Sequence, residues 1–215
     1  MRSFFKGLFG GGGSDESSPR DLEHPRALAA GDIVKMSNHF GLPNALRDQE
    51  FRVLDVFTNQ FEYEFETGFT LEGIARERVS LTIERTGAEE KLVFSRVISP
   101  ETVGDLFSLD AFAEIFDSEA MVSLTARNPS LMPGWVADSY QQSIHRERGY
   151  FYPRDYRNGR PPSDAGEGEP FDYYELGDAS GDFNVEIEVY ESGETDVGLA
   201  VRVPLSAIEE MFPGS

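Results

Sequence analysis

The amino-acid sequence predicts an α+β fold that is mainly an antiparallel twisted sheet or a partly open barrel. Five β-rich segments follow one another between Gln49 and Ile98, separated by short polar or glycine-bearing breaks. Two short helical patterns come directly after them, and the chain ends on a hairpin pattern followed by a helical one. Short helices covering the sheet, and a C-terminal hairpin plus helix, complete the predicted architecture.

The chain of 215 residues is long enough for one good-sized core or two small ones. Residues 1–20 are expected to form a flexible amphipathic tip and a Gly/Ser linker. Residues 21–127 hold a β-meander with two short helices. Residues 128–215 hold a loop-rich Arg/Tyr region, a C-terminal β-hairpin and a helix, packed with residues 21–127 as one globular unit.

The charge balance excludes several classes of function. The chain has 19 basic and 39 acidic residues, which gives a formal net charge of −20. Such a field repels nucleic acid, so we expect no nucleic-acid partner. The absence of cysteine excludes disulfides, thiolate metal sites and a cysteine nucleophile. No window holds the roughly 20 apolar residues of a membrane-spanning helix, and the expected location is the cytoplasm.

The first nine residues form a short amphipathic pattern ahead of a glycine run. On a helical wheel the apolar side chains share one arc and the basic ones lie opposite; they are Met1, Phe4, Phe5, Leu8 and Phe9, with Arg2 and Lys6. The run Gly10–Gly13 and the following serines are typical of a flexible tether. The tip predicts weak contact with an anionic membrane surface or a partner protein. Disorder, or docking in an apolar groove of its own body, are the alternatives.

The central segments alternate as strands do. The first is expected to begin at Ile33, after a Gly-Asp turn. In 61–65 the aromatic residues share one face and the glutamates the other, as in a strand with one dry side. We interpret the acidic stripe Glu62, Glu64 and Glu66 as a solvated sheet face, against the alternatives of a metal site or a basic partner. Segment 78–84 alternates in the same way, and segment 91–98 is predicted to be a largely buried strand. A hairpin loop at 85–88 connects them.

Helix signals follow the meander. Ser99, Pro100 and Glu101 predict a helix start, and Ser108 predicts another. The segments 185–190 and 199–203 alternate on either side of Ser192-Gly193, which predicts a hairpin. Pro204 is then expected to open a terminal helix whose apolar residues have core spacing.

One region is locally basic and rich in tyrosine. Its residues are Arg146, Arg148, Tyr150, Tyr152, Arg154, Tyr156, Arg157 and Arg160. Arginine and tyrosine together are favoured at interfaces, so this region is the predicted site for a protein partner or a small anion. The alternative is that the arginines neutralise acidic strands of the same molecule.

No catalytic, cofactor or metal signature stands out. The three histidines, His24, His39 and His145, lack metal-ligand spacing, and no nucleophile elbow or phosphate-binding glycine loop is present. Asp178, Ser180, Asp182 and Asn184 recur at every second position, but Phe183 and Val189 replace the Gly and Glu of a calcium loop, and a turn explains them. We therefore expect no enzyme activity, no cofactor and no bound metal.

The stretches FFKGLFGGG, ALAAGDIVKM and QEFRVLDVFTNQFEYEF resemble an uncharacterised bacterial family of β-rich domains linked to phage-shock-type membrane-stress operons. The resemblance covers about Leu28 to Ile98 and implies an accessory role at the inner face of the cell membrane. It assigns no catalytic residue. The leading hypothesis is thus a non-enzymatic accessory or adaptor protein, tethered through its tip. The alternatives are a hydrolase or ligand-binding enzyme with a carboxylate site in the sheet, and an acidic inhibitor of a basic protein.

Overall fold

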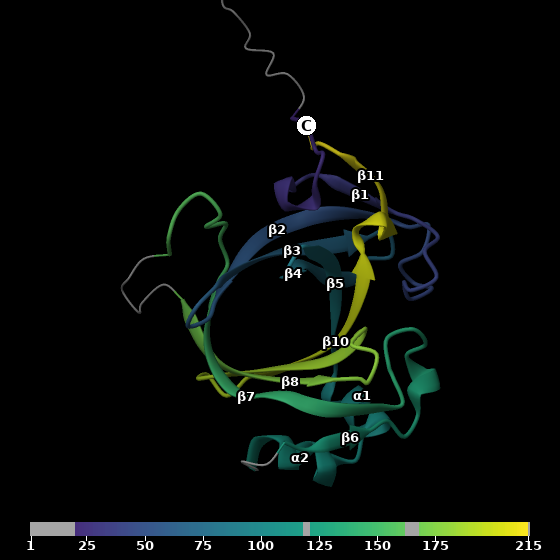
Figure 1. Cartoon of the computed structure of the whole chain (residues 1–215), viewed down its shortest axis with the longest axis vertical. Helices are drawn as coiled ribbons and strands as arrows, with labels where there is room; N and C mark the ends of the chain where they lie inside the picture. Colours follow the sequence, from purple (N-terminus) through teal and green to yellow (C-terminus); the bar gives the residue numbers. More distant parts are fainter. Residues whose placement is uncertain (1–19, 118–120, 162–167, 215) are drawn as a thin grey trace, which may run out of the picture.

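One antiparallel sheet of eleven strands organises the chain (Figure 1). The computed structural model describes residues 20–117, 121–161 and 168–214. The strands are β1 (Ile33–Met36), β2 (Glu50–Gln60), β3 (Phe65–Gly73), β4 (Arg78–Thr86), β5 (Glu89–Ile98), β6 (Ser123–Thr125), β7 (Ser139–Tyr152), β8 (Glu169–Gly177), β9 (Phe183–Tyr190), β10 (Thr195–Pro204) and β11 (Ile208–Phe212). The helices are α1 (Pro100–Leu106), α2 (Leu109–Asp117) and three single 3-10 turns, η1 (Pro25–Ala27), η2 (Pro129–Leu131) and η3 (Leu205–Ala207). The predicted antiparallel, β-rich architecture is confirmed.

The sheet curls into a partial ring. Its strands run in the order β11-β1-β2-β3-β4-β5-β10-β9-β8-β7-β6, and β2 also pairs with β7. The β2–β7 pairing, called the seam below, joins the eight strands β2, β3, β4, β5, β10, β9, β8 and β7 into the ring. The seam consists of three residue pairs, Thr58 with Tyr152, Asn59 with Phe151, and Gln60 with Tyr150. Strands from both halves of the chain therefore share one sheet.

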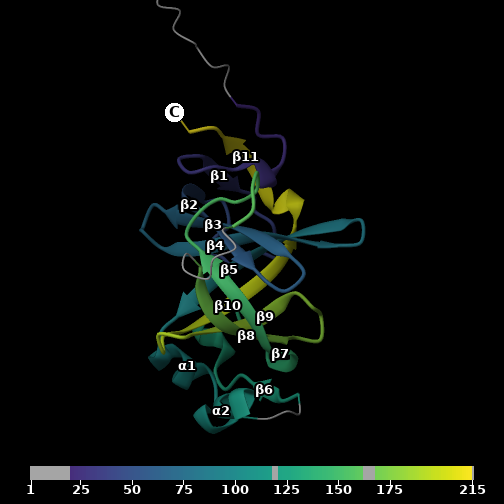
Figure 2. The same cartoon turned by 90° about the vertical axis from the view of Figure 1, so that its left-hand side faces the viewer.

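The two ends of the molecule carry different coverings (Figure 2). Strands β1 and β11 lie at one end with η1, and the helices α1 and α2 lie at the other end with β6. Helix α2 packs on the outer face of β7 and β8, where the Phe116 ring lies 5.2 Å from that of Tyr174. Among the described residues, no helix is both long and apolar enough to cross a membrane.

Alternation along the strands places the core on the outer face of the ring. In β4 the side chains of Val79, Leu81 and Ile83 are buried in the apolar cluster, and Phe94 of β5 joins them. The same cluster continues over β9 and β10 and beneath both end coverings. Burial of each such side chain stabilises the fold by about 1.5–3 kcal/mol, so this outer layer is the main source of stability.

Several predicted elements are confirmed. Strand β1 begins at Ile33, and the β4–β5 hairpin turns at Gly87, whose φ of 63° suits glycine. Helix α1 begins at Pro100 and is capped by Ser99, whose hydroxyl accepts a hydrogen bond from the Thr102 amide at 3.2 Å. The hairpin of β9 and β10 turns at Gly193, where φ is 90°.

The predicted strand at 61–65 is wrong. Strand β2 continues to Gln60, and the amide of Phe61 donates to the carbonyl of Glu64 at 2.9 Å, closing a turn into β3. Tyr63 is 88% exposed at the turn's tip. The alternation misleads because Phe61 packs against Tyr173 across the ring, at 5.6 Å between ring centres, and so does not pair as a strand residue.

The predicted C-terminal helix is also wrong. Residues Leu205–Ala207 make one 3-10 turn, and Ile208–Phe212 form β11, which pairs antiparallel with β1. The short strand β1 would otherwise present unpaired backbone groups along that edge, and β11 satisfies them. The Arg/Tyr region, predicted to be loop-rich, begins as the 14-residue strand β7.

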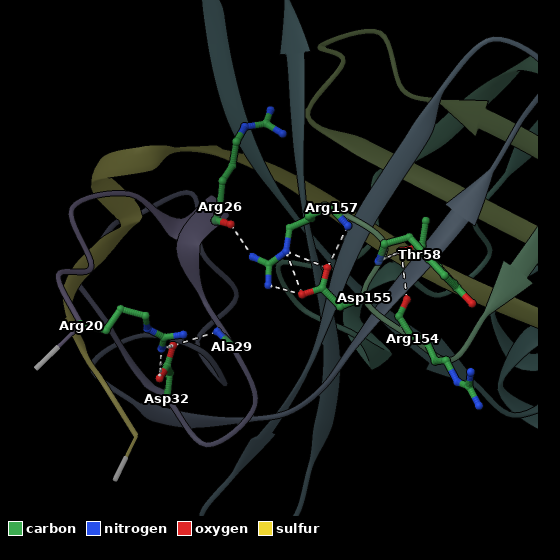
Figure 3. Close-up of polar contacts among 9 residues, drawn as sticks. Arg20, Arg26, Ala29, Asp32, Thr58, Arg154, Asp155 and Arg157 are labelled. Atoms are coloured by element: carbon green, nitrogen blue, oxygen red, sulfur yellow. Dashed lines mark hydrogen bonds and ion pairs between the residues drawn. The ribbon is translucent and has the colours of Figure 1, made fainter. Parts of the chain in front are cut away.

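Asp32 connects the two described ends of the chain (Figure 3). Its carboxylate is 1% exposed and pairs with the guanidinium of Arg20. It also accepts hydrogen bonds from the amides of Ala29, at 2.8 Å, and Gly214, at 2.7 Å. A buried carboxylate is tolerated because charged and backbone donors surround it.

We expect Asp32→Asn to lower the free energy of unfolding by about 2–4 kcal/mol, because an amide cannot accept all these bonds and leaves Arg20 unpaired. Urea unfolding of the variant measures this loss. Asp55→Asn, at an exposed position of β2, is the matched control and should change stability by less than about 0.5 kcal/mol. Equal stability of the two variants would contradict the role given to Asp32.

Candidate functional site

The ring encloses a cavity of about 900 Å³. The side chains that line it come from all eight strands of the ring and from the β2–β3 turn. Such a volume is within the range of small-molecule sites. The inner face of the ring is therefore the candidate functional site.

The inner face is polar because it carries the alternate residues of the same strands that bury the core. On β4 these are Ser80, Thr82 and Glu84. Small residues keep the space open at several points: Ser80 lies opposite Ser95 on β5, and Gly198 lies beside it on β10. The pattern leaves a cavity where larger alternating residues would fill the ring.

Two irregularities in β7 redirect its side chains. The pairing with β8 shifts register between Gln142 and Ile144 and again between Ile144 and Glu147, and Arg146 has a φ of 59°. Gln142 donates to the carbonyl of Ile115 in α2, on the outer face, whereas Ile144 and Glu147 both line the cavity. These bulges bring Glu147 inside the ring.

The cavity lining is strongly acidic. It holds ten carboxylates and four arginines. Eight of the carboxylates lie on strands: Glu66, Glu84, Glu147, Glu169, Glu175, Glu186, Glu188 and Asp196. The excess of negative charge favours a cationic occupant over an anionic one.

Two of the four cavity arginines have an ion pair described, Arg78 and Arg202, and Arg202 on β10 is the more buried of the two. Its side chain is 12% exposed and holds Glu84 with two hydrogen bonds, of 2.7 and 2.9 Å, and Glu175 at 3.4 Å. Burial alone would lower the pKa of Arg202, but the bonds and attraction from Glu84 outweigh it and raise that pKa. In return, Arg202 lowers the pKa of Glu84. This group neutralises part of the acidic wall.

Two other carboxyl groups, Glu66 and Glu186, have raised pKa values, although the charge of Arg202 acts to lower that of Glu186. Burial raises the pKa of Glu66 to about 7 and that of Glu186 to about 8. Repulsion from Glu64 and Glu84 adds to the shift of Glu66, and repulsion from Glu175 and Glu66 adds to that of Glu186. Hydrogen bonds from Asn59 and Thr82 to Glu66, and from Ser95 to Glu186, act in the opposite direction but do not cancel the effect of burial. Neither carboxylate forms an ion pair in the part of the chain that the structure describes.

Aromatic rings form another part of the wall. Tyr173 donates to Glu175 at 3.2 Å, and burial raises the pKa of its hydroxyl well above the usual value. The ring of Phe61 lies edge-on to Tyr173, and Tyr190 and Phe151 also face the cavity. A ligand inside would meet both carboxylates and apolar ring faces.

The predicted tip residues, Met1, Arg2, Phe4, Phe5, Lys6, Leu8 and Phe9, lie outside the described residues. The predicted Arg/Tyr residues are described, and the structure distributes them over several places. Arg146 and Arg148 lie on the outer face of β7 and bind Asp172 at 3.0 and 3.1 Å, and Arg148 also binds Glu191. The guanidinium carbon of Arg148 lies 5.8 Å from the centre of the Tyr150 ring.

The remaining Arg/Tyr residues belong to the seam and the loop after it (Figure 3). Tyr152 is buried and donates to Gln60 at 3.1 Å, and the carbonyl of Arg154 accepts from Thr58 at 3.0 Å. The other three members are Tyr156, which meets the Tyr152 ring at 5.5 Å, Arg157, which binds Asp155 and the Arg26 carbonyl, and exposed Arg160. Arg146, Arg148 and Arg157 thus contact carboxylates of the same molecule, and a partner site here stays a prediction.

A carboxylate site in the sheet was one of the alternative hypotheses, but the residues that form the acidic cavity were not predicted. The interpretation of Glu62, Glu64 and Glu66 as one solvated stripe grouped residues whose surroundings differ. Glu62 is exposed on the turn, whereas Glu66 is inside the ring. One signal was available, since Glu84, Glu186 and Glu188 each occupy the polar face of an alternating strand. Several wet faces in one sheet can form a shared interior if the sheet closes on them.

The loop at Asp178 is a turn, as interpreted. Its carboxylate accepts hydrogen bonds from the amides of Ser180, Asp182 and Phe183, each at 3.0 Å. Within the described ranges, no three or more histidine, aspartate or glutamate side chains are grouped so as to hold a metal ion. Comparisons of the chain with protein-family models, curated proteins and solved structures found no match.

We expect the protein to lose stability as the pH rises from about 4.5 to about 8. The ordinary pKa of glutamate is 4.5, and Glu66 and Glu186 reach about 7 and about 8 in the fold, so the folded state binds more protons over this range. Each raised pKa therefore adds stability that is fully present below pH 4.5 and lost through pH 7–8. Solvent in the cavity reduces the effect of each group to about 1–2 kcal/mol.

Urea unfolding of the wild type and Glu186→Gln between pH 5 and 8.5 measures this dependence. The variant should show a flatter loss of stability with pH. Glu114→Gln, an exposed position on α2, should retain the wild-type slope. Identical slopes for Glu186→Gln and the wild type would show that Glu186 titrates normally.

Proposed function

We propose that this protein is a non-catalytic binding protein that holds a small organic ligand inside its ring. The observation that carries the proposal is the cavity of about 900 Å³, which has a polar, acidic and aromatic lining. A ring with this polar, open interior lacks the close apolar packing that would otherwise stabilise it, which is expected where the interior has a function. Its position on rigid strands also suits a site that must keep its shape.

Binding is favoured over hydrolysis. A hydrolase with a carboxylate site needs one acid and one base held around a scissile bond. Here the strand carboxylates of the cavity are spread over six strands, and His24, His39 and His145 do not line it. The distribution supports general electrostatic recognition more than a single reacting pair.

The neutral fluorescent probe N-phenyl-1-naphthylamine tests whether the cavity accepts an organic ligand. We expect saturable binding near one probe per chain. Thr70→Trp places a bulky ring on the cavity wall and should weaken binding at least about tenfold, the effect of about 1.4 kcal/mol. Thr86→Trp, exposed at the end of β4, is the matched control and should bind as the wild type does. Absence of saturable binding, or equal binding by Thr70→Trp, would contradict the proposal.

We also propose an accessory role at a membrane surface, carried by the amphipathic sequence of residues 1–13. This proposal is separate, because those residues lie outside the described ranges, and it agrees with the family resemblance of the sequence. Apolar side chains and two basic residues together supply only weak, reversible attachment. The role would bring the ring, with whatever it binds, to the membrane surface.

Membrane fractionation of lysate from the native host tests the tip. The full chain should be found partly with membranes, and a chain in which residues 1–13 are replaced by a Gly/Ser segment of the same length should not. The replacement keeps the tether's length and removes only its side chains. The same distribution for both chains would overturn this role.

A further inference from the structure

Asn59, a residue of the cavity wall, carries a buried acceptor without a partner. It lies on β2, is 7% exposed and lines the cavity. Its side chain forms a hydrogen bond with the carboxylate of Glu66, its neighbour across the β2–β3 pair. An ionised carboxylate can only accept, so the Asn59 amide nitrogen faces Glu66. The amide oxygen has no hydrogen-bond partner in the described part of the chain.

A buried acceptor without a partner destabilises a folded protein, so such atoms are rare. The missing partner must be a hydrogen-bond donor, and Asn59 is one of the residues that line the cavity. The carboxylates of Glu66 and Glu186 are close enough to repel each other, and no described cation pairs with either. Arg202 is already engaged by Glu84 and Glu175.

These three groups together have the chemistry of an ammonium site. An ammonium carries several N–H donors and one positive charge, so it can satisfy the amide oxygen and both carboxylates at once. The charges of Glu186 and Glu66 act on the Tyr173 hydroxyl and raise its pKa, and the Tyr173 ring in the cavity wall offers an aromatic face for the adjoining carbon chain. An anion would be repelled, and a neutral donor would leave the two charges uncompensated.

We propose that Asn59, Glu66 and Glu186 bind the ammonium group of an organic amine that enters the cavity. This inference rests on the proposed binding function and specifies the chemical class of its ligand. The apolar part of the amine lies against the aromatic wall, and the ammonium lies at the β2–β3 side of the ring. The Glu84–Arg202–Glu175 group stays outside this site as a fixed part of the wall.

The test compares two probes that differ by one charge: dansylcadaverine, which has a free ammonium, and its N-acetyl derivative, which has none. The wild type should bind dansylcadaverine at least about tenfold more tightly, as measured by dansyl fluorescence at pH 8. Glu66→Gln and Glu186→Gln should each reduce that preference several-fold while leaving the affinity for the acetylated probe unchanged. Glu114→Gln on α2 should keep the full preference.

Asn59→Leu provides a second, uncharged test of the acceptor. It should also lower the affinity for dansylcadaverine, and circular dichroism checks that it folds. Should it fail to fold, the two glutamate variants decide the matter.

The outcomes separate this inference from the proposed function. Equal binding of both dansyl probes, or an unchanged preference in both glutamate variants, overturns the ammonium site while saturable binding still supports a ligand cavity. Failure of both dansyl probes together with N-phenyl-1-naphthylamine overturns the two proposals at once. Binding of N-phenyl-1-naphthylamine alone overturns only the ammonium site.

Discussion

Repulsion between carboxylates inside the ring is the constraint that the rest of the structure must offset. Two unit charges 4 Å apart interact by about 4 kcal/mol at an effective dielectric constant of 20, so a wall of glutamates opposes closure of the sheet. Arg202 offsets part of this by joining β10 to β4 and β8 through Glu84 and Glu175. Protonation offsets another part, since the pKa of Glu186 is raised to about 8. Apolar packing on the outer face of the strands offsets the remaining repulsion.

The outer face supplies the stability that the inner face does not. Each strand of the ring with clean alternation contributes apolar residues to one continuous core and polar residues to the cavity. The end coverings, with β1 and β11 at one end and α1 and α2 at the other, keep that core from solvent. A cavity can therefore be kept open without loss of the fold, because little of the apolar packing depends on what the ring contains. Departures from local packing rules of this kind are expected at functional sites.

The regular elements were predictable from sequence because local pattern and tertiary role agree in them. The sequences of β4, β9 and β10 alternate with a period of two, β5 reads as a buried apolar strand, and α1 has its serine cap and proline. Strand β7 was not predictable, since its two bulges break the alternation and its outward face carries Arg146 and Arg148 in place of apolar residues. The prediction of a C-terminal helix is wrong for another reason. The apolar spacing of this segment also fits a helix, and only pairing with the free edge of β1 selects the strand. Nothing local to Phe61 or Glu66 distinguishes a turn leading into a cavity from a strand with a wet face.

The candidate site was beyond sequence reasoning for a related reason. Its members are ordinary glutamates on separate strands, and they become a site only when β2 meets β7. Asn59 belongs both to that seam, where it pairs with Phe151, and to the wall beside Glu66. The seam has three residue pairs, with support from the hydrogen bonds of Thr58 to Arg154 and Tyr152 to Gln60. A ligand that requires Asn59 and Glu186 together binds only the closed ring, so its binding free energy also stabilises the seam. Ligand binding in the cavity and closure of the ring at the seam are therefore thermodynamically coupled.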